Sequence, residues 1–342
     1  MSPKNGTNET GVLALTLVIT LGLVGGVFWW LANNSGLSNN IIPNQSRPKQ
    51  DTLTQKINVP SGLFSYGGST TWAPIRKEVE PEIQKLWPNF QLRYTDPTTG
   101  APGSTPGIKM LLDNQLAFSQ SSRSLKDDEY QKAQQRGFQL KEIPVAIDGI
   151  AIAVHPSLQI PGLTLAQLKD IYTGKLTNWQ QVNGPNLPIT PYSRRLEEGG
   201  TIEFFDQNIM GGEKFAANVK FIPTTTQALR EVANNPGGIY YGSAPEVVGQ
   251  CSVKPLPLGR KSDQFIPPYK EPFVPLQNCP QQRNKINVVS FQTGEYPITR
   301  RLFVIIKQNG QSDQQAGEAY ANWLLTAQGQ QLIAKAGFVR IR

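Results

Sequence analysis

The sequence holds little of the chemistry that most enzymes and metalloproteins need. It has one histidine, His155, and two cysteines, Cys251 and Cys279, which do not form a C-x-x-C pair. A single imidazole cannot build a histidine-rich metal site, and a phosphatase or other hydrolase would need a metal cluster or a nucleophile–base pair. The sequence also lacks G-x-S-x-G and H-E-x-x-H motifs. We therefore expect no enzyme activity, no metal and no cofactor.

Runs of like charge are missing as well. The chain of 342 residues carries a formal net charge of +8, but its lysines and arginines are scattered. Nucleic-acid-binding arms usually concentrate basic residues in one run, so we expect no nucleic-acid partner. A mild positive field that attracts a small anion fits this charge distribution equally well.

The run from Gly11 to Ala32 carries no charge, and it contains the paired tryptophans Trp29 and Trp30. At about 1.5 Å per residue, this run can cross a hydrocarbon core of roughly 30 Å. A cleaved signal peptide is the alternative, although its apolar core should be shorter and end in an A-x-A-like site. We predict a transmembrane signal anchor at residues 1–34. A flexible linker rich in Asn, Ser, Gln and Pro is expected at 35–60.

Strand and helix patterns alternate through the rest of the chain, which predicts an α/β fold with mainly parallel sheets. The nearly apolar run Ile143–Val154 suits a strand that is buried on both faces. The other expected strands are Leu63–Tyr66, Phe90–Tyr94, Leu116–Ser119, Leu187–Tyr192, Gly237–Gly242 and Tyr296–Ile306. The expected helices are Ile75–Leu86, Ile108–Asn114, Asp127–Arg136, Leu163–Gly174, Thr224–Asn234 and Glu318–Ala336.

Turns rich in hydroxyl groups or arginine follow several of these strands. They are Ser69–Thr71, Gly103–Gly107, Ser121–Arg123 and Arg194–Thr201. Arginine forks match phosphate oxygens, and Thr201 is placed to cap a helix whose free N–H groups favour an anion. A surface Arg/Glu turn before an ordinary helix would explain the last turn equally simply. Because ligands bind beyond the carboxyl ends of parallel strands, we expect these turns to outline one small polar pocket.

The order and spacing of these motifs resemble the phosphate-binding proteins of bacterial ABC transporters, which have the type II periplasmic binding-protein fold. The matching segments are Gly68–Thr71, Gly103–Gly107, Ser121–Arg123, Asp148–Ala151, Asp170–Lys175 with Asn178–Trp179, Arg195–Thr201 and Tyr296–Arg300. The resemblance implies a substrate-binding domain at 61–342 with two lobes joined by crossing strands. One lobe would comprise about 61–147 plus 297–342, and the other about 148–296.

The resemblance also implies which residues bind the ligand, inorganic phosphate or a similar tetrahedral oxyanion. They are Ser69, Thr70, Thr71, Ser104, Ser122, Arg195, Gly199, Gly200 and Thr201, with Arg195 making the charged contact. Many members have an aspartate at the position of Ser122, where it accepts the proton of phosphate and rejects sulfate. Asp148 or Glu197 could supply that acceptor, and Arg123 could be a further ligand. Gly199 stands where a serine is usual.

The family implies a passive receptor whose closed form docks on the permease subunits of an ABC transporter. We accordingly expect a monomer that is anchored in the inner membrane by its N-terminal helix and faces the periplasm or extracytoplasmic side. In that compartment Cys251 and Cys279 would form a disulfide. A membrane-tethered oxyanion sensor or scaffold, with the same fold and no transport role, is the alternative.

Overall fold

The computed structural model describes residues 57–195 and 199–341. The predicted membrane anchor, most of the linker and Glu197 lie outside these residues. The contacts divide the chain into two units, 1–50 and 51–342, and only the second contains described residues. Within them, no helix has the length and apolar character needed to cross a membrane. Ile57 and Val59, at the end of the predicted linker, pack against the hydrophobic core and are part of the folded domain.

One large mixed sheet runs through the folded domain, in the order β2-β1-β3-β12-β4-β8-β6-β7, with β9 also paired to β4. β1 is parallel to β2 and β3, and β6 is parallel to β7 and β8, whereas β12 is antiparallel to both β3 and β4. The predicted α/β class is confirmed, but the expectation of mainly parallel sheets is wrong, because β4 and β12 are antiparallel to every strand with which they pair. The strands are β1 (Gly62–Gly68), β2 (Phe90–Tyr94), β3 (Phe118–Ser121), β4 (Gln139–Val154), β6 (Thr190–Ser193), β7 (Lys220–Phe221), β8 (Gly238–Ser243), β9 (Lys254–Leu256) and β12 (Thr299–Gln308).

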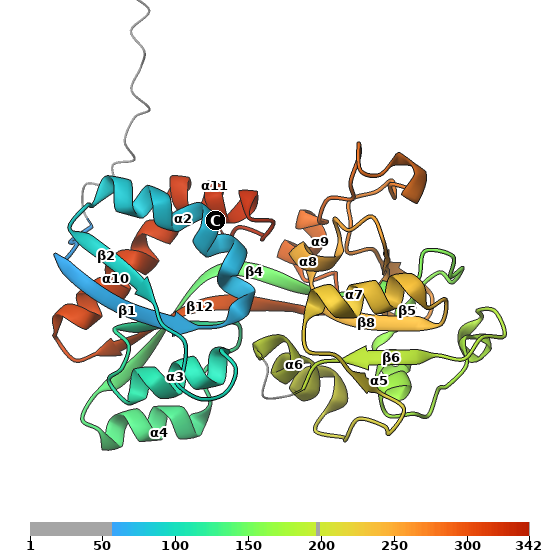
Figure 1. The fold of residues 1–342 in the computed structure, drawn as a ribbon, viewed down its shortest axis with the longest axis horizontal. Coiled ribbons are helices and arrows are strands. Elements are labelled where there is room, and N and C mark those ends of the chain that lie inside the picture. The colour runs from blue at the N-terminus through green and yellow to red at the C-terminus, as the bar shows by residue number, and fades with distance from the viewer. Residues whose placement is uncertain (1–56, 196–198, 342) are drawn as a thin grey trace, which may run out of the picture. The chain divides into compact units, whose positions relative to one another are not determined.

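Two groups of elements form the lobes, and β4 and β12 run between them (Figure 1). The first part of β4, up to Gly149, pairs with β12, and Ile150–Val154 pairs with β8. At Gly149 a side chain would lie only 2.3 Å from the ring of Phe291. This position therefore needs glycine, because a Cβ atom would overlap the ring.

The first lobe places helices on both faces of its strands, over two clusters of buried apolar side chains. The predicted helix Glu318–Ala336 is in fact two helices. The side chain of Thr326 accepts a bond from Gly329 N (3.1 Å), so it caps a new helix and ends the previous one. The helices of this lobe are η2 (Thr70–Trp72), α2 (Ala73–Leu86), α3 (Ser104–Leu112), α4 (Asp127–Gln135), α10 (Ser312–Leu324) and α11 (Ala327–Lys335).

The second lobe has a separate core around Trp179, Tyr172 and Phe205, all fully buried. A small sheet in the order β11-β10-β5 lies beside the main one. The helices are α5 (Leu165–Tyr172), η3 (Trp179–Val182), α6 (Gly200–Phe205), η5 (Asp206–Met210), α7 (Thr225–Asn234), α8 (Ala244–Val247), η6 (Leu276–Asn278) and α9 (Val288–Thr293). The small sheet consists of β5 (Leu163–Thr164), β10 (Leu258–Lys261) and β11 (Gln264–Ile266).

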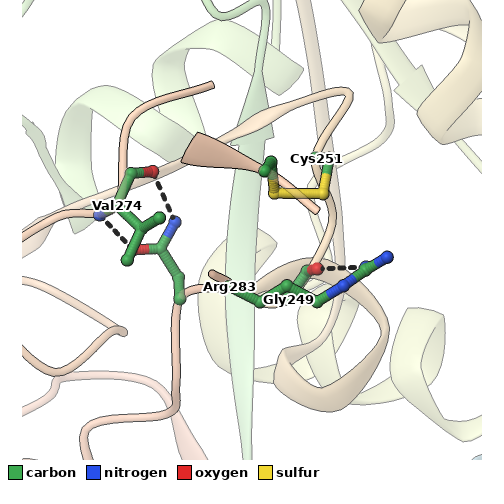
Figure 2. Close-up of a disulfide and its surroundings, with 6 residues drawn as sticks. Gly249, Cys251, Val274 and Arg283 are labelled. Carbon is green, nitrogen blue, oxygen red and sulfur yellow. Dashed lines mark hydrogen bonds between the residues drawn. A yellow bond between two sulfur atoms is a disulfide. The ribbon is translucent and has the colours of Figure 1, made fainter. Parts of the chain in front are cut away.

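A disulfide between Cys251 and Cys279 fastens an irregular segment of this lobe (Figure 2). Near it, Arg283 Nη1 donates to the carbonyl oxygen of Gly249 at 2.8 Å. The backbone of Val274 is bound on both sides by the Asn284 amide, at 2.8 and 3.3 Å. The predicted pairing of the cysteines is confirmed, and it holds a segment that has little regular structure of its own.

Candidate ligand-binding site

Three buried serines from separate turns meet at one point in the first lobe. Ser69 follows β1, Ser122 follows β3, and Ser104 is the first residue of α3. Ser122 Oγ lies 3.0 Å from Ser69 Oγ and 3.2 Å from Ser104 Oγ, which also accepts a bond from Ser122 N at 3.0 Å. Hydroxyl groups can both donate and accept, so this cluster can turn its hydrogens toward an anion.

The second lobe approaches these serines through the start of α6. A Cβ atom at Gly200 would lie 2.3 Å from Ser122 Oγ and 2.6 Å from Ser104 Oγ, so only glycine allows this approach. Gly199 is the N-cap residue with a φ of 147°, and a Cβ atom there would be 3.8 Å from Thr70 Oγ1. The predicted capping role of Thr201 is wrong, because the helix already begins at Gly200 and the Thr201 hydroxyl is used elsewhere.

The Thr201 hydroxyl is directed to a guanidinium from β12, that of Arg300. Arg300 Nη2 lies 2.7 Å from Thr201 Oγ1 and 3.2 Å from Thr71 Oγ1. The side chain is 1% exposed, yet among the described residues Arg300 Nη1 has no hydrogen-bond partner. Buried polar nitrogens are seldom left unpaired. This atom therefore marks a place where a ligand oxygen would be favoured.

Asp148 holds Arg300 in position from the opposite residue of the β4–β12 ladder. Its Oδ2 accepts bonds from Arg300 Nε (3.0 Å) and Nη2 (2.8 Å), and its Oδ1 accepts one from Ser243 Oγ (2.8 Å). Burial raises the pKa of the Asp148 carboxyl, and the Arg300 charge and the Ser243 hydrogen bond oppose that shift. The backbone N–H of Ala244 donates to the same carboxylate, so its four acceptor sites are taken. Asp148 therefore orients Arg300, and the expected role as acceptor of a ligand proton does not fit.

The PBP superfamily domain matches residues 44–328. The chain belongs to this superfamily. Over 276 residues it is 26% identical to the phosphate-binding protein PstS of Staphylococcus epidermidis, covering 80% of this chain and 77% of that protein. It is 24% identical over 335 residues to PstS of Staphylococcus aureus, covering 96% of this chain and 86% of that one.

Solved structures of similar fold include two with TM-scores above 0.6. One is a candidate phosphate ABC transporter substrate-binding protein with bound phosphate from Clostridium perfringens. Its TM-score is 0.65 and its identity 23%, and the match covers 82% of this chain and all of the other. The second is an ABC-type phosphate transport receptor from Vibrio cholerae, with a TM-score of 0.62, 21% identity and coverage of 81% and 99%. These likenesses support the two-lobed fold of the superfamily.

Two other arginines, Arg123 and Arg195, were predicted to bind the ligand. Arg123 was expected as a further ligand, but its N–H groups already donate to Glu129, Glu203, Thr105 and Ser124 at 2.7–3.0 Å. These bonds use all five N–H groups of a guanidinium. The expectation is therefore wrong, and Arg123 has a structural role between the lobes.

Arg195, predicted to make the charged contact, has an exposed side chain. Its neighbour Arg194 is half-buried, donates from Nε to Pro223 O at 3.2 Å, and has Nη1 within 3.9 Å of a Cβ atom at Gly199. The buried guanidinium among the hydroxyls is that of Arg300, which the sequence predictions did not include. One feature of the sequence could have indicated Arg300: it is a permanently charged residue within the mainly apolar predicted strand Tyr296–Ile306.

A further arginine, Arg76, stabilises the turn that contains Ser69. Arg76 Nη1 donates to Ser69 O (3.3 Å) and Gln120 Oε1 (2.9 Å), and the guanidinium lies 3.9 Å from the centre of the Tyr94 ring. One turn along α2, Glu80 accepts a hydrogen bond from Tyr66, and burial raises the pKa of Glu80 to about 7. Within residues 57–195 and 199–341, no group of histidine, cysteine, aspartate or glutamate could hold a metal ion.

Proposed function

We propose that this chain binds inorganic phosphate between its lobes and delivers it to the permease subunits of an ABC transporter. The observation that carries the proposal is the buried, unpartnered Nη1 of Arg300 beside hydroxyls from both lobes. The relatives named phosphate-binding protein PstS support phosphate as the anion. The two-lobed fold supports a receptor that closes around its ligand.

Arg300 would supply the charged contact, because a guanidinium offers paired donors that match phosphate oxygens. The surrounding hydroxyls and backbone amides would replace the water around the anion. Helix starts favour this role, since their first N–H groups have no acceptor within the helix. The residues that we assign to the site with Arg300 are Ser69, Thr70, Thr71, Ser104, Ser122, Gly199, Gly200 and Thr201.

Ser122 bears on the choice between phosphate and sulfate. A serine hydroxyl can accept the proton of hydrogen phosphate, but it can also donate to a fully deprotonated oxyanion. An ionised carboxylate accepts hydrogen bonds but cannot donate them, and its negative charge would repel sulfate. We therefore expect phosphate to be preferred by a smaller factor than in family members with an aspartate at this position.

The location of the protein follows from the same assignment. We propose that residues 1–34 anchor the chain in the inner membrane and that the binding domain, a monomer, faces the extracytoplasmic side. The Cys251–Cys279 disulfide supports this placement, because disulfides persist mainly in oxidising compartments.

Titration calorimetry of the purified chain with phosphate and then with sulfate tests the binding. We expect phosphate to bind with a Kd of about 1 μM or below, a free energy near −8 kcal/mol. The absence of heat with either anion would refute the proposal. Phosphate uptake by cells lacking the protein tests the transport role, and normal uptake despite tight binding would favour a sensor.

A further inference from the structure

A network of hydrogen bonds joins the two lobes beside the proposed phosphate site. Its members bind one another and are not among the residues assigned to the ligand. Arg123 Nε donates to Glu203 Oε2 at 2.9 Å, and Arg123 Nη2 donates to Thr105 Oγ1 at 2.7 Å. The Thr105 hydroxyl in turn donates to Glu203 Oε1. Arg123 and Thr105 belong to the first lobe and Glu203 to α6 of the second. We propose that these three residues form a latch that holds the lobes closed, with Glu203 as a positioning residue that slows phosphate release.

The first-lobe half of the latch is fixed in advance. Glu129 accepts bonds from Arg123 Nη2 (2.7 Å) and Nη1 (3.0 Å), and its Oε2 also accepts one from Lys126 N at 2.8 Å. Arg123 is 4% exposed. A guanidinium held by a bidentate carboxylate loses little conformational freedom when a further partner arrives. Arg123 is therefore ready to receive Glu203 whether or not a ligand is present.

The second-lobe half is a single side chain on the helix that reaches the ligand site. Glu203 is three residues after Gly200, and residues with this spacing lie on the same side of a helix. The docking of α6 that brings Gly200 against the serines therefore also brings Glu203 to Arg123. Ligand enclosure and latch formation are two results of one movement of α6.

Solvent reaches the edge of this network. A groove of about 600 Å³ has Thr105, Gly103 and Ser104 in one wall and Glu203 and Gly199 in the other. The Glu203 side chain is 15% exposed, whereas that of Arg123 is 3% exposed. When the lobes part, Glu203 can exchange Arg123 for water, while Arg123 keeps Glu129. The latch can thus open without leaving a buried charge unpaired.

The test uses Glu203→Gln, which removes the charge, keeps the size and leaves the Arg123–Glu129 pair intact. Spin labels are attached at two exposed positions, through Gln131→Cys in α4 and Ala217→Cys in the second lobe. Double electron–electron resonance then measures the distance between the labels, and so between the lobes. In the phosphate-free full chain we expect E203Q to shift the distances to longer values. A matched control is Asp206→Asn, which lies one turn further along and lines the same groove, and it should leave the distances unchanged.

The second measurement rests on the proposed function and follows radiolabelled phosphate during a chase with unlabelled phosphate. We expect E203Q to release it about tenfold faster or more, since a charge-assisted pair across the lobes is lost, with a smaller change in the association rate. An E203Q chain with unchanged distances would overturn the latch, even if its melting temperature fell. So would an unchanged release rate. If the unsubstituted chain binds no phosphate, the proposed function fails, and the distances alone decide the latch.

Discussion

Replacing Arg300 with lysine tests whether its guanidinium makes the charged contact with the anion. Arg300 is bound to Asp148 through Nε and Nη2 and approaches two threonine hydroxyls, which leaves Nη1 for a ligand. Lysine keeps the positive charge beside Asp148. Its single ammonium cannot also reach the position of Nη1, because it lacks the planar fork.

The size of the effect follows from the bonds that are lost. One charge-assisted hydrogen bond to the anion is worth about 1.5–3 kcal/mol, which corresponds to a rise in Kd of roughly 10- to 150-fold. The Asp148 charge stays neutralised in Arg300→Lys. The free energy of unfolding should therefore fall by less than the roughly 3–5 kcal/mol that follows removal of one partner of a buried ion pair.

Calorimetry with phosphate and urea unfolding without it separate these two effects. Arg195→Lys is the matched control, because it makes the same chemical change at an exposed position. An unchanged phosphate Kd in Arg300→Lys would refute the reasoning. An equal loss in Arg195→Lys would show that the charged contact comes from the other lobe.

Two further predictions concern closure and pH. Gly200→Ala would place a methyl group 2.3 Å from Ser122 Oγ, so we expect phosphate binding to weaken by about 100-fold or more through blocked closure. The melting temperature without phosphate should change little, and a large drop would instead mean that the lobes must touch for the chain to fold. Burial holds the pKa of Glu80 at about 7, above its ordinary 4.5. The folded state therefore binds this proton more tightly than the unfolded state, and stability should fall as pH rises from about 4.5 to 7. Thermal unfolding across this range should show a smaller fall in Glu80→Gln, and an identical pH profile would contradict the assignment.

The turns of the candidate site could be predicted because each carries its own local signal. Ser69 and Ser122 follow strands that were predicted close to their observed ends, and Ser104 begins a helix. The carboxyl ends of parallel strands share one edge of a sheet, so strand order alone brings such residues together. The two glycines before Thr201 likewise indicated a close backbone approach.

The charged contact could not be predicted in the same way, because it depends on strand pairing between distant segments. Arg300 faces Asp148 only in the observed register of β12 against β4, and a shift of one residue would turn it to the other face. The family resemblance assigned the charged contact to Arg195, in the segment that precedes the glycines. The matching segment Ser121–Arg123 made Arg123 a possible further ligand, but the sequence could not show that Glu129 and Glu203 already bind its guanidinium.

The ion pair of Arg300 and Asp148 lies on the two strands that pass between the lobes, next to the point where β4 exchanges β12 for β8 as its partner. In a rotation of one lobe against the other, atoms close to the pivot travel least. The Arg300 guanidinium would thus keep nearly the same position in the open and in the closed arrangement of the lobes. In the phosphate binding that we propose, an entering anion would therefore meet the guanidinium first, and Gly200 and Thr201 of the second lobe would then complete its enclosure.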